Sequence, residues 1–104
     1  MLCFDDITGT TYETGGQVVV LHGELDVATG APLRADLRRR FDEGERDVVI
    51  DLGDVSFIDA AGLGILVGAH RLYTNAGGSL RVRAPQRSVH RLLEITGLTR
   101  VLEG

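Results

Sequence analysis

The chain has 104 residues, of which 43% are hydrophobic and 25% are charged, and its formal net charge is -4. This length and composition predict one folded domain, over residues 1–104, with an apolar core of its own. The acidic balance argues against a nucleic-acid partner, because nucleic-acid-binding proteins concentrate basic side chains on one face. All 11 basic residues are arginines, which excludes Schiff-base chemistry on lysine and the lysine of a phosphate-binding loop.

The cysteine content and the hydropathy of the sequence indicate the cellular compartment in which the protein is expected. Cys3 is the only cysteine, which excludes an internal disulfide framework and a thiolate metal cluster. No apolar run approaches the roughly 20 residues that span a bilayer. The N-terminal residues are acidic where a secretion signal would be basic. These features predict a cytoplasmic protein with no membrane insertion.

The N-terminal part of the sequence predicts a β-hairpin. Loose alternation over residues 7–13 indicates an edge strand, and Gly15 and Gly16 indicate the turn that follows it. The apolar run Val18–Leu21 then predicts a more central strand over residues 17–22.

A first helix is predicted after this hairpin, because Leu33, Leu37 and Phe41 recur at helical spacing. We expect Pro32 in the first turn, where its missing N–H costs little. Either Asp26 or Thr29 then caps the helix, and the sequence does not decide between them.

The central stretch predicts a strand, a link and a second helix. The β-branched run Val48–Leu52 indicates a strand buried on both faces, with residues 53–59 as the link. Asp59 stands where a helix N-cap would. The apolar stripe of the helix is Leu63, Leu66, Val67 and His70, and Gly77 and Gly78 end it.

The first turn of this second helix carries very small side chains, at Ala60, Ala61, Gly62 and Gly64. They leave the positive end of the helix and its free N–H groups open to a partner. Small residues also let a helix pack closely on a sheet. Both interpretations remain open at this point.

The C-terminal third predicts one more strand and one more helix. Leu80 and Val82 alternate with arginines, as in a strand near a sheet edge, and Pro85 ends it. The last helix carries Val89, Leu92 and Leu93 on its apolar face, has Gly97 at C′, and is followed by Val101 and Leu102 packed back on the body. Strands joined through helices by right-handed crossovers define an α/β domain.

No residue pattern requires a cofactor or a metal. The acids Glu24, Asp26, Asp51, Asp54 and Asp59 gather near strand ends, yet helix capping and turn formation explain them equally well. His22, His70 and His90 lack ligand spacing, and His70 is expected as a hydrogen-bonded core residue. Gly62-Leu63-Gly64 lacks the third glycine of a dinucleotide fingerprint. A binding module is therefore favoured over a small acid/base enzyme.

Several short motifs, taken together in their order and spacing, resemble a STAS domain of the bacterial anti-sigma factor antagonist type. They are Gly23–Asp26 with Thr29, Val49–Leu52, Val55–Asp59, Gly62–Gly64 and Leu93–Leu98. The resemblance extends from about Val18 to Leu102. It implies a small mixed sheet, of about four to five strands, with helices packed mainly on one side.

The resemblance also implies a function by binding. Family members bind an anti-sigma factor, often a serine kinase of the histidine-kinase-like ATPase type, and so free a sigma factor. A weak homodimer is compatible with this family. The implied partner-binding residues surround the start of the second helix: Asp26, Thr29, Asp59, Ala60, Ala61, Gly62, Leu63 and Ile65. For Leu63 and Ile65, simple core packing is an alternative explanation.

The sequence departs from the family pattern at the position of its phosphoacceptor. In the family this helix opens Asp-Ser-Ser/Thr-Gly, and the hydroxyl residue before the glycine is phosphorylated. Here Ala60 and Ala61 occupy the two hydroxyl positions, so Ala61 cannot be phosphorylated. Neither Ser56 nor Thr29 stands at the acceptor position. A STAS scaffold, or an accessory subunit of a stress-signalling or transport complex, is the main alternative function.

Overall fold

The protein is described by a computed structural model, which covers residues 2–5, 11–15 and 18–102. Five strands form one sheet in the order β1-β2-β3-β4-β5. The strands are β1 (Leu2–Asp5), β2 (Thr11–Gly15), β3 (Val18–Leu25), β4 (Asp47–Ile58) and β5 (Ser79–Arg83). The first two pairings are antiparallel, whereas β3–β4 and β4–β5 are parallel.

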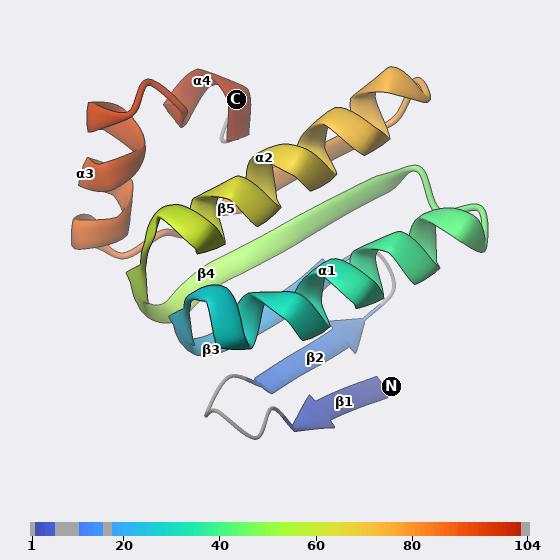
Figure 1. The fold of residues 1–104 in the computed structure, drawn as a ribbon, viewed down its shortest axis with the longest axis horizontal. Coiled ribbons are helices and arrows are strands. Elements are labelled where there is room, and N and C mark those ends of the chain that lie inside the picture. The colour runs from blue at the N-terminus through green and yellow to red at the C-terminus, as the bar shows by residue number, and fades with distance from the viewer. Residues whose placement is uncertain (1, 6–10, 16–17, 103–104) are drawn as a thin grey trace.

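Two long helices make the crossovers between the parallel strands. Helix α1 (Val27–Asp42) joins β3 to β4, and α2 (Ala60–Asn75) joins β4 to β5. Figure 1 shows them side by side across the same face of the sheet. The shorter helices α3 (Arg87–Ile95) and α4 (Thr99–Leu102) follow β5 and pack against β4 and β5 respectively. The predicted mixed sheet with helices mainly on one side is thus confirmed.

The core lies between the sheet and the helices. Its fully buried large side chains include Leu21, Ile50, Leu52, Leu66 and Leu93. In β4 the side chains of Val49 and Asp51 are only partly buried. The prediction that this strand is buried on both faces was therefore wrong, because the long helices cover only one face of the sheet.

Strand β4 is also longer than its sequence indicates. Residues 53–58, predicted as a link, continue the strand and pair with the second half of β3, ending at Leu25 opposite Ile58. The ladder contains two register shifts, between Val20 and His22 and between Gly23 and Glu24. This irregular pairing obscures the alternation by which a strand is recognised, although Val55 and Ile58 are buried.

In the first half of the chain, the strands and the position of Pro32 differ from the predictions. Strand β1 was not predicted, and β2 is Thr11–Gly15, while residues 6–10, 16 and 17 lie outside the description. Pro32 lies in the second turn of α1 and not in the first, because the helix begins directly after Asp26, the earlier of the two expected caps. It is exposed, and the helix continues past it to Asp42.

The predicted helix ends are confirmed. Gly77 and Gly97 follow the caps of α2 and α3 with φ of 84° and 74°. The next N–H in each case donates back to a carbonyl in the last turn, as in a Schellman motif. At the C-terminus Leu102 is buried, but Val101 is 39% exposed, so only one of the two expected contacts is made. No helix in the described ranges is long and apolar enough to cross a membrane.

Candidate partner-binding site

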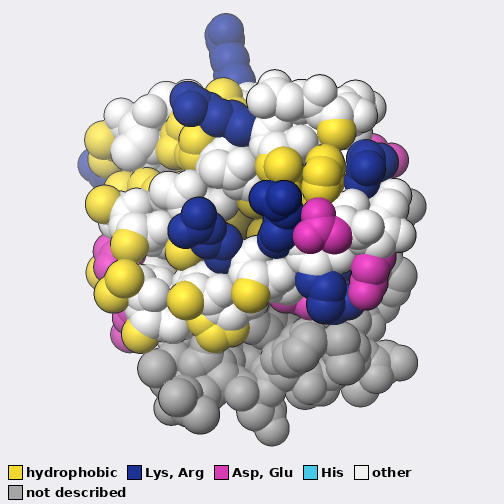
Figure 2. All heavy atoms as spheres, turned by 45° about the vertical axis from the view of Figure 1, so that its right-hand side comes forward, with side chains coloured by type: hydrophobic (Ala, Val, Ile, Leu, Met, Phe, Trp, Pro, Cys, Tyr) yellow, Lys and Arg dark blue, Asp and Glu magenta, His cyan; other side chains and the backbone are white. Residues whose placement is uncertain are grey.

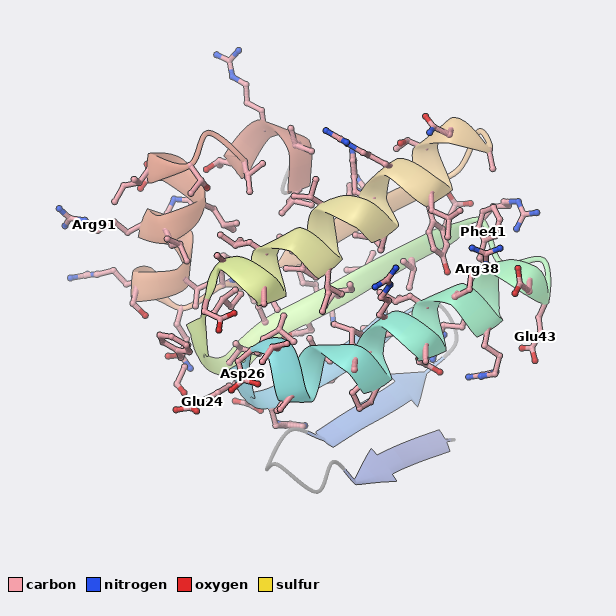
Figure 3. The ribbon with its side chains drawn as sticks, viewed as in Figure 1. Glu24, Asp26, Arg38, Phe41, Glu43 and Arg91 are labelled. Carbon is pink, nitrogen blue, oxygen red and sulfur yellow. The ribbon has the colours of Figure 1, made fainter. Side chains whose placement is uncertain are left out.

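The two long helices begin next to each other at the edge where β3 and β4 end. Leu25 and Ile58, the last residues of these parallel strands, are register partners. The N–H of Asp59 donates to the carbonyl of Leu25 over 3.2 Å, which ties the two strand ends together. Figure 3 shows Asp26 at this edge, at the start of α1. The topology therefore brings both capping aspartates into one site.

The start of α1 is closed by its own side chains. Asp26 Oδ1 accepts from the N–H groups of Ala28 (2.9 Å) and Thr29 (3.0 Å), which identifies Asp26 as the N-cap. Thr29 Oγ1 accepts from the N–H of Asp26 (2.8 Å) and donates to the carbonyl of Glu24 (2.7 Å). Thr29 is 1% exposed, so it acts by holding this turn together rather than by meeting a partner.

These contacts favour the ionised form of Asp26. The hydrogen bond from the backbone N–H of Thr29 holds the pKa of the Asp26 carboxyl below its ordinary value, and the Thr29 hydroxyl and the N–H of Ala28 act in the same direction. The carboxylate thus adds a fixed negative charge beside the start of α2.

The first backbone N–H groups of α2 are less completely capped than those of α1. Asp59 Oδ1 accepts only from the N–H of Gly62, over 2.9 Å. Within the described part of the chain, the N–H groups of Ala60 and Ala61 have no recorded protein acceptor. Ala60 is exposed and Ala61 is half-buried, and neither carries a side chain that would hide the backbone. A partner can therefore reach both N–H groups.

The two interpretations of the small residues apply to different positions. A Cβ on Gly62 would lie 2.5 Å from the carbonyl oxygen of Leu25, so Gly62 is needed for close packing of the helix on the strand. A Cβ on Gly64 would meet nothing within 4 Å. Gly62 therefore serves the fold, while Gly64 leaves an exposed gap on the outer face of α2.

The remaining two expected site residues lie deeper. Leu63 is 9% exposed and belongs to the core, and Ile65 is partly buried against it. Ile65 fits against Gly30 of α1, where an added Cβ would collide with its Cδ1 atom. The structure thus gathers the expected residues in one region, where Asp26, Asp59, Ala60 and Ala61 remain at least partly accessible.

Two apolar residues at the same edge were missed. Val27 is 72% exposed and follows the cap of α1, and Phe57 is 49% exposed near the end of β4. Phe57 pairs with Glu24 across the parallel ladder, so it lies close to the start of α1. Such large exposed apolar side chains typify contact surfaces when they cluster. Their sequence signal was weak, because Phe57 directly precedes the buried Ile58 and Val27 lies two residues after the buried Leu25.

The acids farther from the helix starts contact side chains of neighbouring strands. Asp54 contacts Nδ1 of His22 at 2.9 Å, and Asp51 contacts Nε of Arg83 at 3.0 Å. The backbone N–H of Gly53 lowers the pKa of Asp51, as does Arg83. His70 Nδ1 lies 3.0 Å from the carbonyl oxygen of Leu80, in line with the predicted hydrogen bond. Within the described ranges no three His, Cys, Asp or Glu side chains form a group that could hold a metal ion.

Comparison with known proteins identifies the family. The STAS domain model matches residues 10–103. The anti-sigma-B factor antagonist of Bacillus subtilis is 36% identical over 85 residues, which cover 82% of this chain and 77% of that protein. The anti-sigma F factor antagonist of Paenibacillus polymyxa is 30% identical over 92 residues, covering 88% and 79%.

A solved structure agrees with these matches. An anti-sigma factor antagonist from Mycobacterium paratuberculosis superposes with a TM-score of 0.73 at 26% identity, over 89% of this chain and 80% of that one. The fold with its two adjoining helix starts is thus a STAS fold. The chain belongs to the STAS domain family and, within it, to the anti-sigma factor antagonists.

Proposed function

We propose that this protein is an anti-sigma factor antagonist that binds an anti-sigma factor through the start of α2 and thereby releases a sigma factor in the cytoplasm. The observation that carries the proposal is the accessible backbone at Ala60 and Ala61, flanked by the exposed side chains of Val27 and Phe57. The relatives named as antagonists of anti-sigma factors support the choice of partner.

The surface suits a close protein contact. The small side chains let a partner backbone approach the free N–H groups, and Val27 and Phe57 supply apolar area that is lost from water on binding. The carboxylates of Asp26 and Asp59 favour a partner with a basic or hydrogen-bonding group at this point. The partner we propose is an anti-sigma factor of the serine-kinase type with a histidine-kinase-like ATPase fold.

The proposed binding is not ended by phosphorylation at the family position. Ala61 has no oxygen that could attack a γ-phosphoryl group, and Ala60 has none either. The free N–H groups there would otherwise favour a phosphate. A phosphate beside Asp26 and Asp59 would add about -1.5 to -2 charges and would oppose a close contact. The protein therefore stays competent to bind unless another residue provides the control.

The variant Ala61→Glu tests the proposed surface. It places a bulky charge at the start of α2, and we expect the affinity for the cognate anti-sigma factor to fall more than tenfold, or more than about 1.4 kcal/mol. Isothermal titration calorimetry measures the loss. Ala76→Glu, at the exposed end of the same helix, is the matched control and should bind as the parent does. Unchanged affinity of a folded Ala61→Glu variant would place the contact elsewhere.

The variant Ala61→Ser tests the absent phosphoacceptor. Incubation with the cognate kinase and ATP should add one phosphate to the variant and none to the parent at this position, as read by intact mass and peptide mapping. A phosphate at residue 61 requires the introduced hydroxyl. If the variant binds the kinase but gains no phosphate, the start of α2 is not presented to the kinase as proposed.

A further inference from the structure

A groove of about 880 Å³ lies between α1 and α2 on the side that faces away from the sheet. It begins near the proposed partner-binding site, at Val27 and Ala61, and continues along both helices to Arg38 and Leu72. Only its first end coincides with the proposed site. Most of the groove lies outside the proposed partner-binding site.

The two helices touch at depth, and their outer edges stay apart. Ile65 fits against Gly30 near one end, and the rings of Phe41 and Tyr73 pack edge to face at 5.3 Å near the other. Half of the residues that line the groove between these contacts are alanine or glycine. A Cβ on Gly64 or on Gly68 would meet nothing within 4 Å, so this space is unfilled. A third element can therefore come close to both helix backbones.

The dimensions suit a helix. Val27 and Arg38 on α1, like Ala61 and Leu72 on α2, are separated by a length of about 16 Å, or three helical turns. Both edges present residues at intervals of three and four, the spacing at which the side chains of another helix interdigitate. A straight groove with small residues on both edges accepts the apolar ridge of an amphipathic helix.

The charged side chains that line the groove determine which edge of a bound helix would face α1. Among the residues that the structure describes, Arg34 and Arg38 are the only charged ones that line the groove, although the whole chain carries a net charge of -4. Arg38 reaches Asp42 at 3.1 Å. No ion pair or hydrogen bond is recorded for Arg34 in the described part of the chain, and it is exposed. Figure 2 shows basic side chains interspersed with apolar ones on this side of the molecule.

We propose that the groove between α1 and α2 binds an amphipathic helix of a partner protein, about three turns long, whose apolar ridge lies over Gly64 and Gly68 and whose acidic edge faces Arg34. The proposal is independent of phosphorylation and of the sigma factor, since it rests on the groove and its charge alone. The acidic edge specifies orientation, because only the α1 side of the groove is basic.

Two synthetic helical peptides provide the probe. They share one ridge of alanine and leucine, and they differ only in the edge that would face Arg34, which carries glutamates in one and lysines in the other. Fluorescence anisotropy should show that the parent protein binds the glutamate peptide at least tenfold more tightly. Amide chemical shifts should change at Ala35, Gly64 and Gly68. Equal affinity for the two peptides, no binding of either, or shifts confined to other surfaces would overturn the proposal.

A charge reversal makes the test specific. In Arg34→Glu the preference should invert, so that the lysine peptide binds more tightly than the glutamate peptide. Arg91→Glu on α3, equally exposed and remote from the groove, is the matched control and should keep the parental preference. An unchanged preference in a folded Arg34→Glu variant would contradict the proposal.

Filling the groove is the steric test. Gly68→Leu adds a side chain where a Cβ meets nothing, so we expect the fold to persist, as checked by circular dichroism, and both peptides to lose binding at least tenfold. The same variant should still bind the anti-sigma factor at the start of α2, which separates failure of this proposal from failure of the proposed function. Full peptide binding by Gly68→Leu would show that the groove is not the binding site.

Discussion

The starts of α1 and α2 lie next to each other and have similar backbone geometry, yet the first N–H groups of α1 are more completely capped than those of α2. Each helix follows the end of a parallel strand and opens with an aspartate in an extended conformation, with φ of -133° at Asp26 and -102° at Asp59. At the third helical position α1 has Thr29 and α2 has Gly62. The threonine closes a capping box, whereas the glycine allows the helix to lie against the carbonyl of Leu25.

Because of this difference, the start of α1 mainly stabilises the fold, whereas the start of α2 leaves backbone groups that a partner can reach. At the start of α1 the polar side chains bind the backbone N–H groups of the same turn, so what remains for a partner is the carboxylate charge of Asp26 and the exposed side chain of Val27. At the start of α2, Gly62 packs closely against Leu25 on the side that faces the sheet, while the N–H groups of Ala60 and Ala61 are accessible on the side that faces solvent. Four substitutions at the two helix starts test whether these roles are assigned correctly.

The largest effect is expected for Gly62→Ala. The new Cβ would lie 2.5 Å from the carbonyl oxygen of Leu25, and backbone must move to admit it. We expect a loss of about 2 kcal/mol in the free energy of unfolding, measured by urea denaturation. Gly64→Ala is the matched control in the same turn, where the Cβ is unobstructed, and should gain about 0.5–1 kcal/mol through helix propensity. Equal behaviour of the two variants would show that α2 is not held against β3 as described.

Thr29→Val is expected to come next. It keeps the shape of a side chain that is 1% exposed, but removes the hydroxyl that serves the N–H of Asp26 and the carbonyl of Glu24. Removing these two hydrogen bonds should cost about 1.5 kcal/mol. Thr29→Ser, which retains the hydroxyl, should lose much less. Thermal or urea unfolding that cannot distinguish valine from threonine would contradict a closed capping box.

A smaller effect is expected at the cap of α2. Asp59→Ala removes one hydrogen bond, to the N–H of Gly62, and should lower the free energy of unfolding by about 1 kcal/mol. Asp59→Asn, which can still accept this bond, should remain close to the parent. Urea unfolding curves of Asp59→Ala that coincide with those of the parent would show that α2 starts without help from Asp59.

The smallest effect concerns the charge of Asp26. Its pKa is lower in the folded protein than in the unfolded chain, so its ionisation stabilises the fold above the unfolded pKa of about 3.9. That stabilisation is lost as the pH falls through the folded pKa. Asp26→Asn keeps a capping oxygen but does not titrate. The stability difference between parent and variant should therefore be constant near neutral pH and shrink below about pH 4. A difference that grows on acidification would contradict this sign.

Features fixed by neighbouring residues were predictable. The cap at Asp59 and the helix ends at Gly77 and Gly97 depend on local backbone geometry, which a few consecutive residues specify. The amphipathic spacing of the helices and the exposed alternation of β5 also show directly in the sequence. These local signals were sufficient for the α/β order, and the spaced motifs added the resemblance to the STAS family.

The features that the sequence left open or missed depended on specific contacts, one of them within a single turn and the other between two strands. Asp26 caps α1 because Thr29 is taken up by the carbonyl of Glu24, and Pro32 consequently falls in the second turn. Strand β4 continues to Ile58 because the irregular end of β3 pairs with it, which no periodicity of β4 itself indicates.

Most helices and strands of this protein, and their order along the chain, could be predicted from residues that are close together in sequence, although β1 and α4 were not. The small residues at the start of α2 are also evident from the sequence. Only the tertiary structure decided which of those small residues serve packing and which stay accessible, because the answer depends on whether the carbonyl of Leu25 or solvent lies beyond each glycine. The same holds for the exposed pair Val27 and Phe57 and for the groove beside Arg34. Each is made by residues from two elements, and the parallel pairing of β3 with β4 sets their relative position.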